Sequence, residues 1–109
     1  MQQVSVVDLV AAVVAGTGEV IDVRERHEFV AGHIPGAVHV PLHLVPLREA
    51  DFRGSRPIYV ICESGARSWQ AATYLDRAGI SVNNVQGGMT AWRGAGLAVA
   101  TGEPAATDW

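Results

Sequence analysis

The sequence contains a single cysteine, Cys62, and the residues after it have types and spacing that favour a reactive thiol. They are Glu63, Ser64, Gly65, Ala66, Arg67 and Ser68. A free thiol with a pKa near ~8.5 is mostly protonated at neutral pH, whereas the thiolate is the nucleophile. Backbone N–H groups that converge in a glycine-containing turn, followed by the N-terminus of a helix, favour a negative charge. This segment therefore predicts an ionised, nucleophilic Cys62 at the mouth of a ring of amide hydrogens.

The other residues of the segment have different expected effects on the sulfur. Gly65 tolerates the positive φ that a rapid reversal of the chain requires. Arg67 should stabilise the thiolate, and the hydroxyls of Ser64 and Ser68 could donate to it. Glu63 works against ionisation, because a nearby carboxylate raises a thiol pKa unless its side chain points to solvent. We expect Cys62 to be catalytic and residues 63–68 to bind the substrate.

A plainer interpretation of Cys62 is a small hydrophobic residue in the core. One cysteine cannot form an internal disulfide, and free cysteines are often buried, so composition alone favours this interpretation. The position of Cys62 after a strongly apolar run favours the functional interpretation instead. Ligands of open α/β sheets bind at the carboxyl ends of the strands.

The elements that must position this segment alternate between short apolar runs and helical patterns. Strands are predicted near residue 4 and over residues 20–23, 37–40, 57–61 and 82–85, and helices over residues 5–15, 24–31, 67–78 and 90–93. Residues 42–56 have no clean period and predict a loop that contains one helical turn, and residues 97–99 should pack or pair near the end. Strands separated by helices require crossover connections. The pattern therefore predicts an α/β fold, a three-layer sandwich with a mainly parallel sheet of about five strands. Residues 1–100 should form one domain and residues 101–109 a mobile tail.

Composition and charge exclude several classes of function. The chain has 109 residues and a formal net charge of −3, which disfavours a general nucleic-acid binder. It has no apolar run of about 18 residues and no signal-peptide pattern at its start, which predicts a cytoplasmic protein that does not span a membrane. Pro41 lies between His39 and His43, so these two histidines should not share a helix face. We expect no metal site and no cofactor.

Four short segments of the sequence resemble the rhodanese superfamily. Asp-Val-Arg at residues 22–24, Glu-Phe at residues 28–29 and Gly-His-Ile-Pro-Gly-Ala at residues 32–37 are similar to its amino-terminal signature. Gly-Gly-Met-Thr-Ala-Trp at residues 87–92 is similar to its carboxyl-terminal Gly-Gly-x-x-x-Trp element. Cys62 lies between these segments, as the family's cysteine does. The resemblance spans about residues 20 to 97 and implies a single rhodanese-like domain.

The resemblance also implies a sulfur-transfer mechanism. Cys62 would attack the outer sulfur of a small anionic donor such as thiosulfate, become a persulfide, and pass the sulfur to cyanide or a thiol. Residues 63–67 would supply the backbone cradle, and Arg67 would close it. Six residues run from Cys62 to Arg67, one fewer than in the family's phosphatases and arsenate reductases. The shorter loop favours sulfur over phosphate.

Two features leave alternatives open. Vertebrate-type thiosulfate enzymes of the family have cationic residues directly after the cysteine, whereas this chain has Glu63. A persulfide or a protein partner is therefore an alternative donor. The chain could also be a persulfide carrier or a protein-interaction module with little turnover of small molecules.

Some residues outside the segment have weaker expected roles. Arg24 should pair with chain neighbours such as Asp22, and it could also approach the pocket. Trp69 could line the mouth of the pocket, Trp92 should pack in the core, and Trp109 should belong to the tail.

Overall fold

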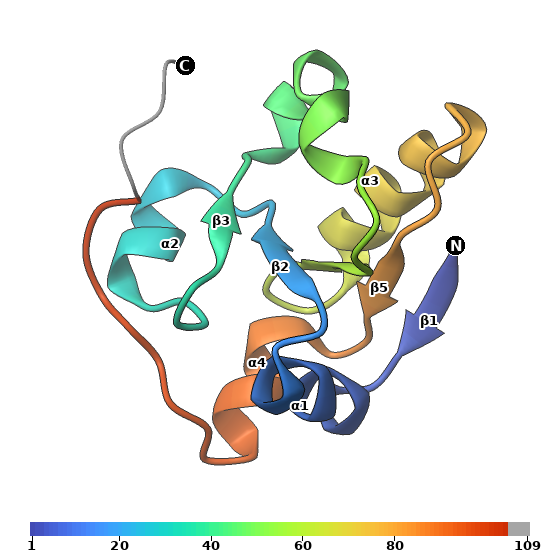
Figure 1. The fold of residues 1–109 in the computed structure, drawn as a ribbon. Coiled ribbons are helices and arrows are strands. Elements are labelled where there is room, and N and C mark those ends of the chain that lie inside the picture. Colours follow the sequence, from blue (N-terminus) through green and yellow to red (C-terminus); the bar gives the residue numbers. More distant parts are fainter. Residues whose placement is uncertain (105–109) are drawn as a thin grey trace.

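The computed structural model describes residues 1–104 and contains a five-stranded sheet covered by helices on both faces (Figure 1). The strands are β1 (Gln2–Val4), β2 (Glu19–Asp22), β3 (Val38–His39), β4 (Ile58–Ile61) and β5 (Asn83–Val85). Their order is β1-β5-β4-β2-β3, and every neighbouring pair is parallel. The predicted α/β class and the parallel five-stranded sheet are therefore confirmed.

Four α-helices connect or follow the strands, namely α1 (Val6–Ala15), α2 (Arg26–Ala31), α3 (Ala66–Arg77) and α4 (Gly88–Gly94). Helix α1 begins with a capping box formed by Ser5 and Asp8. The Ser5 hydroxyl accepts from the Asp8 N–H at 3.2 Å, and the Asp8 carboxylate accepts from the Ser5 N–H at 3.1 Å. This exchange satisfies two backbone donors that a helix start otherwise leaves free.

The prediction for residues 42–56 is wrong in one respect, because the structure has two 3₁₀-helices there. They are η1 (Leu42–Leu47) and η2 (Glu49–Phe52). Val45 and Phe52 anchor them, at 1% and 2% exposure, in the core. A 3₁₀-helix has three residues per turn, and Pro46 lies inside η1. The sequence therefore lacks the 3.6-residue period by which a longer α-helix is recognised.

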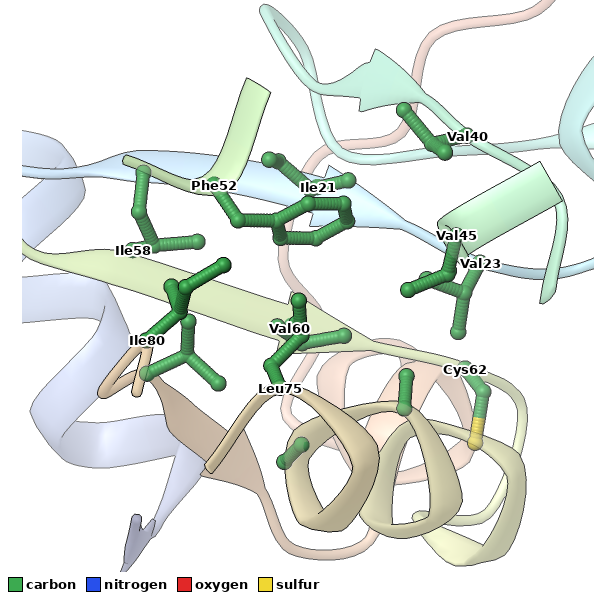
Figure 2. Packing of buried hydrophobic residues seen from close by; sticks show 13 residues of the cluster. Ile21, Val23, Val40, Val45, Phe52, Ile58, Val60, Cys62, Leu75 and Ile80 are labelled. Carbon is green, nitrogen blue, oxygen red and sulfur yellow. The ribbon is translucent and has the colours of Figure 1, made fainter. Parts of the chain in front are cut away.

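The core has two parts, one on each face of the sheet. Residues of α3, η1 and η2 cover one face, and residues of α1 and α4 cover the other. Side chains alternate between faces along a strand, so Ile58 and Val60 of β4 point to the α3 side and Ile61 to the opposite side. Cys62 continues this alternation and lies on the α3 side, beyond Val60 (Figure 2). The pleat of β4 thus sets the direction of the cysteine.

The last described residues run along α2 rather than away from the domain. His33 and Ala100 form an antiparallel bridge, and the Gly102 N–H donates to the Val30 carbonyl at 2.9 Å. Glu103 forms an ion pair with Arg26. Part of the segment expected to be a tail therefore contacts α2. Trp109 lies outside the described residues.

Within residues 1–104, the structure has no helix with the length and apolar character that crossing a membrane requires.

Candidate active site

Cys62 lies immediately after β4, at the carboxyl end of the parallel sheet, where the chain turns into α3. Its Sγ accepts hydrogen bonds from the Gly65 N–H at 3.1 Å and from the Ser68 hydroxyl at 3.3 Å. Gly65 has a φ of +104°, a conformation that residues with a Cβ rarely adopt. This conformation directs the turn back over the sulfur. The predicted cradle around Cys62 is thus present in the geometry of the loop.

Hydrogen bonding in the loop favours the ionised form of the thiol. Burial raises the pKa of Cys62. Hydrogen bonds from the Ser68 side chain and from the backbone N–H groups of Ser68, Gly65 and Ser64 lower the pKa, and together they outweigh the effect of burial. The net result is a Cys62 pKa below the ordinary value. Donors interact with S⁻ more strongly than with S–H, which explains the direction.

The sulfur lies deeper than the sequence predicts. The expected position was the mouth of the amide ring, whereas the Cys62 residue is only 1% exposed. Figure 2 shows its sulfur directed toward the helix that follows the loop. The two interpretations of Cys62, a buried residue and a hydrogen-bonded thiol, therefore both describe it. Its Cβ packs with the core, and its Sγ faces the N–H groups of the loop.

Ser64, Ala66 and Ser68 contribute in different ways. Ser64 is exposed and acts on the sulfur through its backbone N–H rather than through its hydroxyl. Ser68 is fully buried and contributes both its hydroxyl and its N–H. Ala66 is exposed and begins α3. The hydroxyl donor expected from this segment is thus that of Ser68.

Arg67 is held at the side of the loop by α2. Its guanidinium donates two hydrogen bonds to the Glu28 carboxylate, at 2.7 and 2.8 Å. The bond from Arg67 is the main reason that the pKa of Glu28 is lowered to about 2. The same bond raises the pKa of Arg67, and the negative charge of Cys62 adds a smaller contribution. Arg67 is therefore near enough to interact with the thiolate, but its hydrogen bonds go to Glu28.

Glu63 has partners on both carboxylate oxygens, an arrangement that the sequence does not reveal. Oε1 accepts from Arg24 Nη1 at 3.3 Å, and Oε2 accepts from Thr90 Oγ1 at 2.9 Å and from Arg93 Nη2. The side chain is 34% exposed. The sequence offers two positions for this carboxylate, beside the sulfur or in solvent, and the structure shows a third. Two guanidinium groups offset its charge.

Arg24 links the amino-terminal motif to the cysteine loop. It is 2% exposed and donates to the Asp22 carboxylate through Nε at 3.0 Å and Nη2 at 2.8 Å, and Nη2 also donates to the Gly32 carbonyl at 2.6 Å. These contacts confirm the expected pairing with chain neighbours. They also explain the spacing of Asp22, Arg24 and Gly32 in the sequence. Because it also donates to Glu63, Arg24 is in direct contact with the cysteine loop.

The start of α4 packs directly against the cysteine loop. The Met89 N–H donates to the Cys62 carbonyl at 2.9 Å, and the Thr90 N–H donates to the Glu63 carbonyl at 3.0 Å. A Cβ at Gly88 would lie 2.3 Å from the Cys62 carbonyl oxygen, and Gly88 has a φ of +53°. Only glycine fits this close approach. The contact gives Gly88, the second glycine of the carboxyl-terminal Gly-Gly-x-x-x-Trp segment, a physical role.

Two pockets flank the loop among the described residues. One has a volume of about 420 Å³ and is lined by Arg24, His27, Glu28, Ala31, Gly32, Glu63, Arg93 and Val99. The other has a volume of about 350 Å³ and is lined by Gln3, Ser64, Gly65, Ala66, Trp69, Asn84, Gln86 and Gly87. We call them the charged pocket and the amide pocket. Trp69, which is 45% exposed, borders the amide pocket and so lies where the sequence analysis expects it.

Sequence reasoning missed Thr90 and Arg93 as neighbours of the cysteine loop. The two residues are three apart on a short helix, so they share a face, and this spacing is the only signal. Their contact with Glu63 depends on how α4 packs, which the spacing does not determine.

The family model for the rhodanese-like domain matches residues 6–95 of the chain. The chain belongs to the rhodanese-like domain family. It is 39% identical over 84 residues to a sulfurtransferase of Allochromatium vinosum, a match that covers 76% of this chain and 78% of that protein. It is 41% identical over 76 residues to the thiosulfate sulfurtransferase GlpE of Pseudomonas syringae, covering 67% of this chain and 70% of the relative.

A solved structure extends the likeness of this rhodanese-like domain to the whole fold. The crystal structure of a rhodanese-related protein from Thermoplasma volcanium has a TM-score of 0.84 and 26% sequence identity. The match covers 92% of this chain and 98% of that one. The five-stranded parallel sheet described above is therefore a rhodanese-like fold.

Proposed function

We propose that this rhodanese-like domain is a sulfurtransferase in which Cys62 carries a sulfane sulfur as a persulfide. The observation that supports this most directly is the set of donors around Sγ, which lowers the pKa of the thiol although the residue is buried. A structural cysteine in an apolar core would have a raised pKa. The sulfurtransferase names of two relatives at about 40% identity agree with this chemistry.

The proposed reaction has two steps. In the first, the Cys62 thiolate attacks the outer sulfur of thiosulfate, the bond between the two sulfur atoms of the donor breaks, and sulfite leaves with the electron pair. In the second, cyanide or a thiolate attacks the outer sulfur of the Cys62 persulfide and regenerates the Cys62 thiolate. The product is thiocyanate or a new persulfide. This is covalent catalysis by a double displacement.

The loop residues have supporting roles in this proposal. Ser64, Gly65 and Ser68 supply the N–H and O–H donors that stabilise the thiolate, and the same donors would stabilise a terminal persulfide anion. Glu63, Ala66 and Arg67 border the place where the donor must approach. We assign these six residues to substrate binding and Cys62 to catalysis.

The test compares the wild-type protein with Cys62→Ser. The wild type should form thiocyanate from thiosulfate and cyanide, and its intact mass after incubation with thiosulfate should rise by about 32 Da, one sulfur atom. The Cys62→Ser variant should show neither effect. Equal thiocyanate formation by both proteins would contradict the assignment of Cys62.

The mass measurement also separates the enzyme from a persulfide carrier. A stable adduct of about 32 Da with negligible thiocyanate formation would indicate a carrier that passes sulfur to, or receives it from, a protein partner. Rapid thiocyanate formation, with the adduct formed in thiosulfate alone and largely consumed once cyanide is added, supports the enzyme. The absence of both effects with every donor would refute sulfur transfer through this cysteine.

A further inference from the structure

The guanidinium groups around the Cys62 loop already have carboxylate partners within the chain. The pairs are Arg24 with Asp22 and Glu63, Arg67 with Glu28, and Arg93 with Glu63. Three positive and three negative charges sum to zero in this group. Ionisation of Cys62 then makes the local charge negative, and Glu25 adds a further negative charge close enough to act on Arg67.

Glu63 is the central member of this arrangement. Its two oxygens engage Arg24, Arg93 and the hydroxyl of Thr90, so these donors bind a carboxylate of the protein rather than facing an incoming anion. Glu63 follows Cys62 in the chain, and it lines the charged pocket together with Arg24 and Arg93. An inorganic dianion that approaches the loop from this side meets a site whose positive charge is already neutralised.

The charged pocket has room for an organic group next to these ion pairs. Its volume is about 420 Å³, and Ala31, Gly32 and Val99 form the apolar part of its wall. Ligand pockets of roughly 300–1,000 Å³ hold small organic molecules. The pocket therefore offers contact to a carbon-containing substituent, which thiosulfate lacks.

We propose that Glu63 is a specificity-determining residue that disfavours dianionic donors, so that the preferred sulfur donor is a singly charged organic compound. The chemical class is R–SO₂–S⁻ or R–S–S⁻, with the group R in the charged pocket. This inference rests on the proposed sulfur transfer and specifies its donor.

The first step for this class of donor balances without a further reactant. The Cys62 thiolate attacks the outer sulfur of R–SO₂–S⁻, the bond between the two sulfur atoms of the donor breaks, and R–SO₂⁻ leaves with the electron pair. One thiolate and one monoanion thus become one persulfide anion and one sulfinate. Thiosulfate would instead bring two negative charges to the same place and release sulfite with two.

The experiment compares benzenethiosulfonate, a monoanion, with thiosulfate, a dianion, and uses cyanide as the acceptor for both. For the wild type, kcat/KM should be higher for benzenethiosulfonate. Glu63→Gln keeps the shape of the side chain and removes its charge. The variant should raise kcat/KM for thiosulfate relative to benzenethiosulfonate by about fivefold, the effect of one partly screened charge on the additional charge of the dianion.

Glu19→Gln is the matched control, because it makes the same change of charge at the amino end of β2, whereas the cysteine loop lies at the carboxyl end of the parallel sheet. Glu19 is 47% exposed and pairs with Arg56, far from the cysteine loop in the sheet. Its ratio of the two kcat/KM values should equal that of the wild type. A Glu63→Gln ratio within about twofold of the Glu19→Gln ratio would overturn the role of Glu63.

Salt provides a second measurement that needs no variant and decides the matter if Glu63→Gln does not fold. Raising the ionic strength from about 0.02 M to about 0.5 M screens repulsion, so wild-type kcat/KM should improve more for thiosulfate than for benzenethiosulfonate. A steeper fall for thiosulfate would contradict the inference. If the wild type forms no thiocyanate from either donor, the proposed function itself fails. If both donors react but neither charge nor salt changes their ratio, only the inference about Glu63 fails.

Discussion

Ser68→Ala removes a side-chain donor to the Cys62 sulfur and leaves the backbone of the loop intact. The Ser68 hydroxyl lies 3.3 Å from Sγ, and Ser68 is fully buried, so water cannot readily replace it. This hydroxyl is the largest of the contributions that lower the pKa of Cys62. Its loss should raise that pKa.

The size of the effect follows from the strength of a hydrogen bond to a charged group. Such bonds contribute about 1.5–3 kcal/mol. Sulfur is a larger and softer acceptor than oxygen, so we take the lower end of that range. One pKa unit corresponds to about 1.36 kcal/mol, and the pKa of Cys62 should therefore rise by about one unit. At a pH below both pKa values, the variant should contain about tenfold less thiolate than the wild type.

The assay is the rate of alkylation by iodoacetamide as a function of pH, with Cys62→Ser as the blank. Burial of Cys62 slows the reaction at every pH, but the midpoint of the profile still reports the pKa. Ser64→Ala is the control, because Ser64 acts through its backbone N–H and the variant keeps that group. Its midpoint should stay within a few tenths of a unit of the wild type. Equal midpoints for Ser68→Ala and Ser64→Ala would refute the idea that the buried hydroxyl stabilises the thiolate.

Two further predictions concern the contacts that hold the loop in place. Gly88→Ala should lower the free energy of unfolding by about 3 kcal/mol or more in urea titrations, because its Cβ would lie 2.3 Å from the Cys62 carbonyl oxygen at a φ of +53°. Gly94→Ala in the same helix, with no atom within 4 Å of the added Cβ, should lose far less, and similar losses would contradict the close-approach argument. Glu28→Gln should cost about 1–2 kcal/mol at neutral pH, a value reduced for the partial exposure of the ion pair with Arg67. Since the pKa of Glu28 is lowered to about 2 in the folded protein, its contribution is complete above its unfolded value of ~4.3 and is lost as the pH falls toward 2. Urea titrations at several pH values should show the variant and the wild type converging in acid, and a constant difference would refute this account.

Local signals in the sequence were sufficient for most of the fold. The Ser5 capping box defines the start of α1, and the apolar run before Cys62 is β4. Each signal involves residues close together in the chain, so it can be recognised without knowledge of the fold. The two 3₁₀-helices escaped prediction because their period is short and Pro46 interrupts the pattern.

The contacts of Glu63 could not be predicted because they depend on the order of the strands. Strand β4 lies between β2 and β5, so the residue after β4 meets Arg24 after β2 and the helix that follows β5. The partners of Glu63 are distant in the chain: Arg24 is 39 residues away, Thr90 is 27 and Arg93 is 30. No local pattern specifies which strands become neighbours.

The depth of the sulfur, in contrast, was available from the sequence. Ile58, Val60 and Cys62 follow one another at intervals of two residues, so their side chains lie on the same face of β4 and its continuation. Ile58 and Val60 are buried. This period places the Cys62 side chain in the same layer as the core. The prediction of a position at the mouth of the amide ring gave too much weight to the glycine-containing turn.

The contact between α4 and the cysteine loop fixes the direction of the peptide groups around the sulfur. The carbonyl ends at Cys62 and Glu63 are taken up by the N–H groups of Met89 and Thr90, and the N–H ends at Ser64 and Gly65 are left for the sulfur. These dipoles are oriented by the folded chain before any charge forms, so little reorganisation is needed when the sulfur becomes negative. The backbone of the loop thus solvates that negative charge in place of water. The loop is held in this conformation by α4, a short helix more than twenty residues later in the chain.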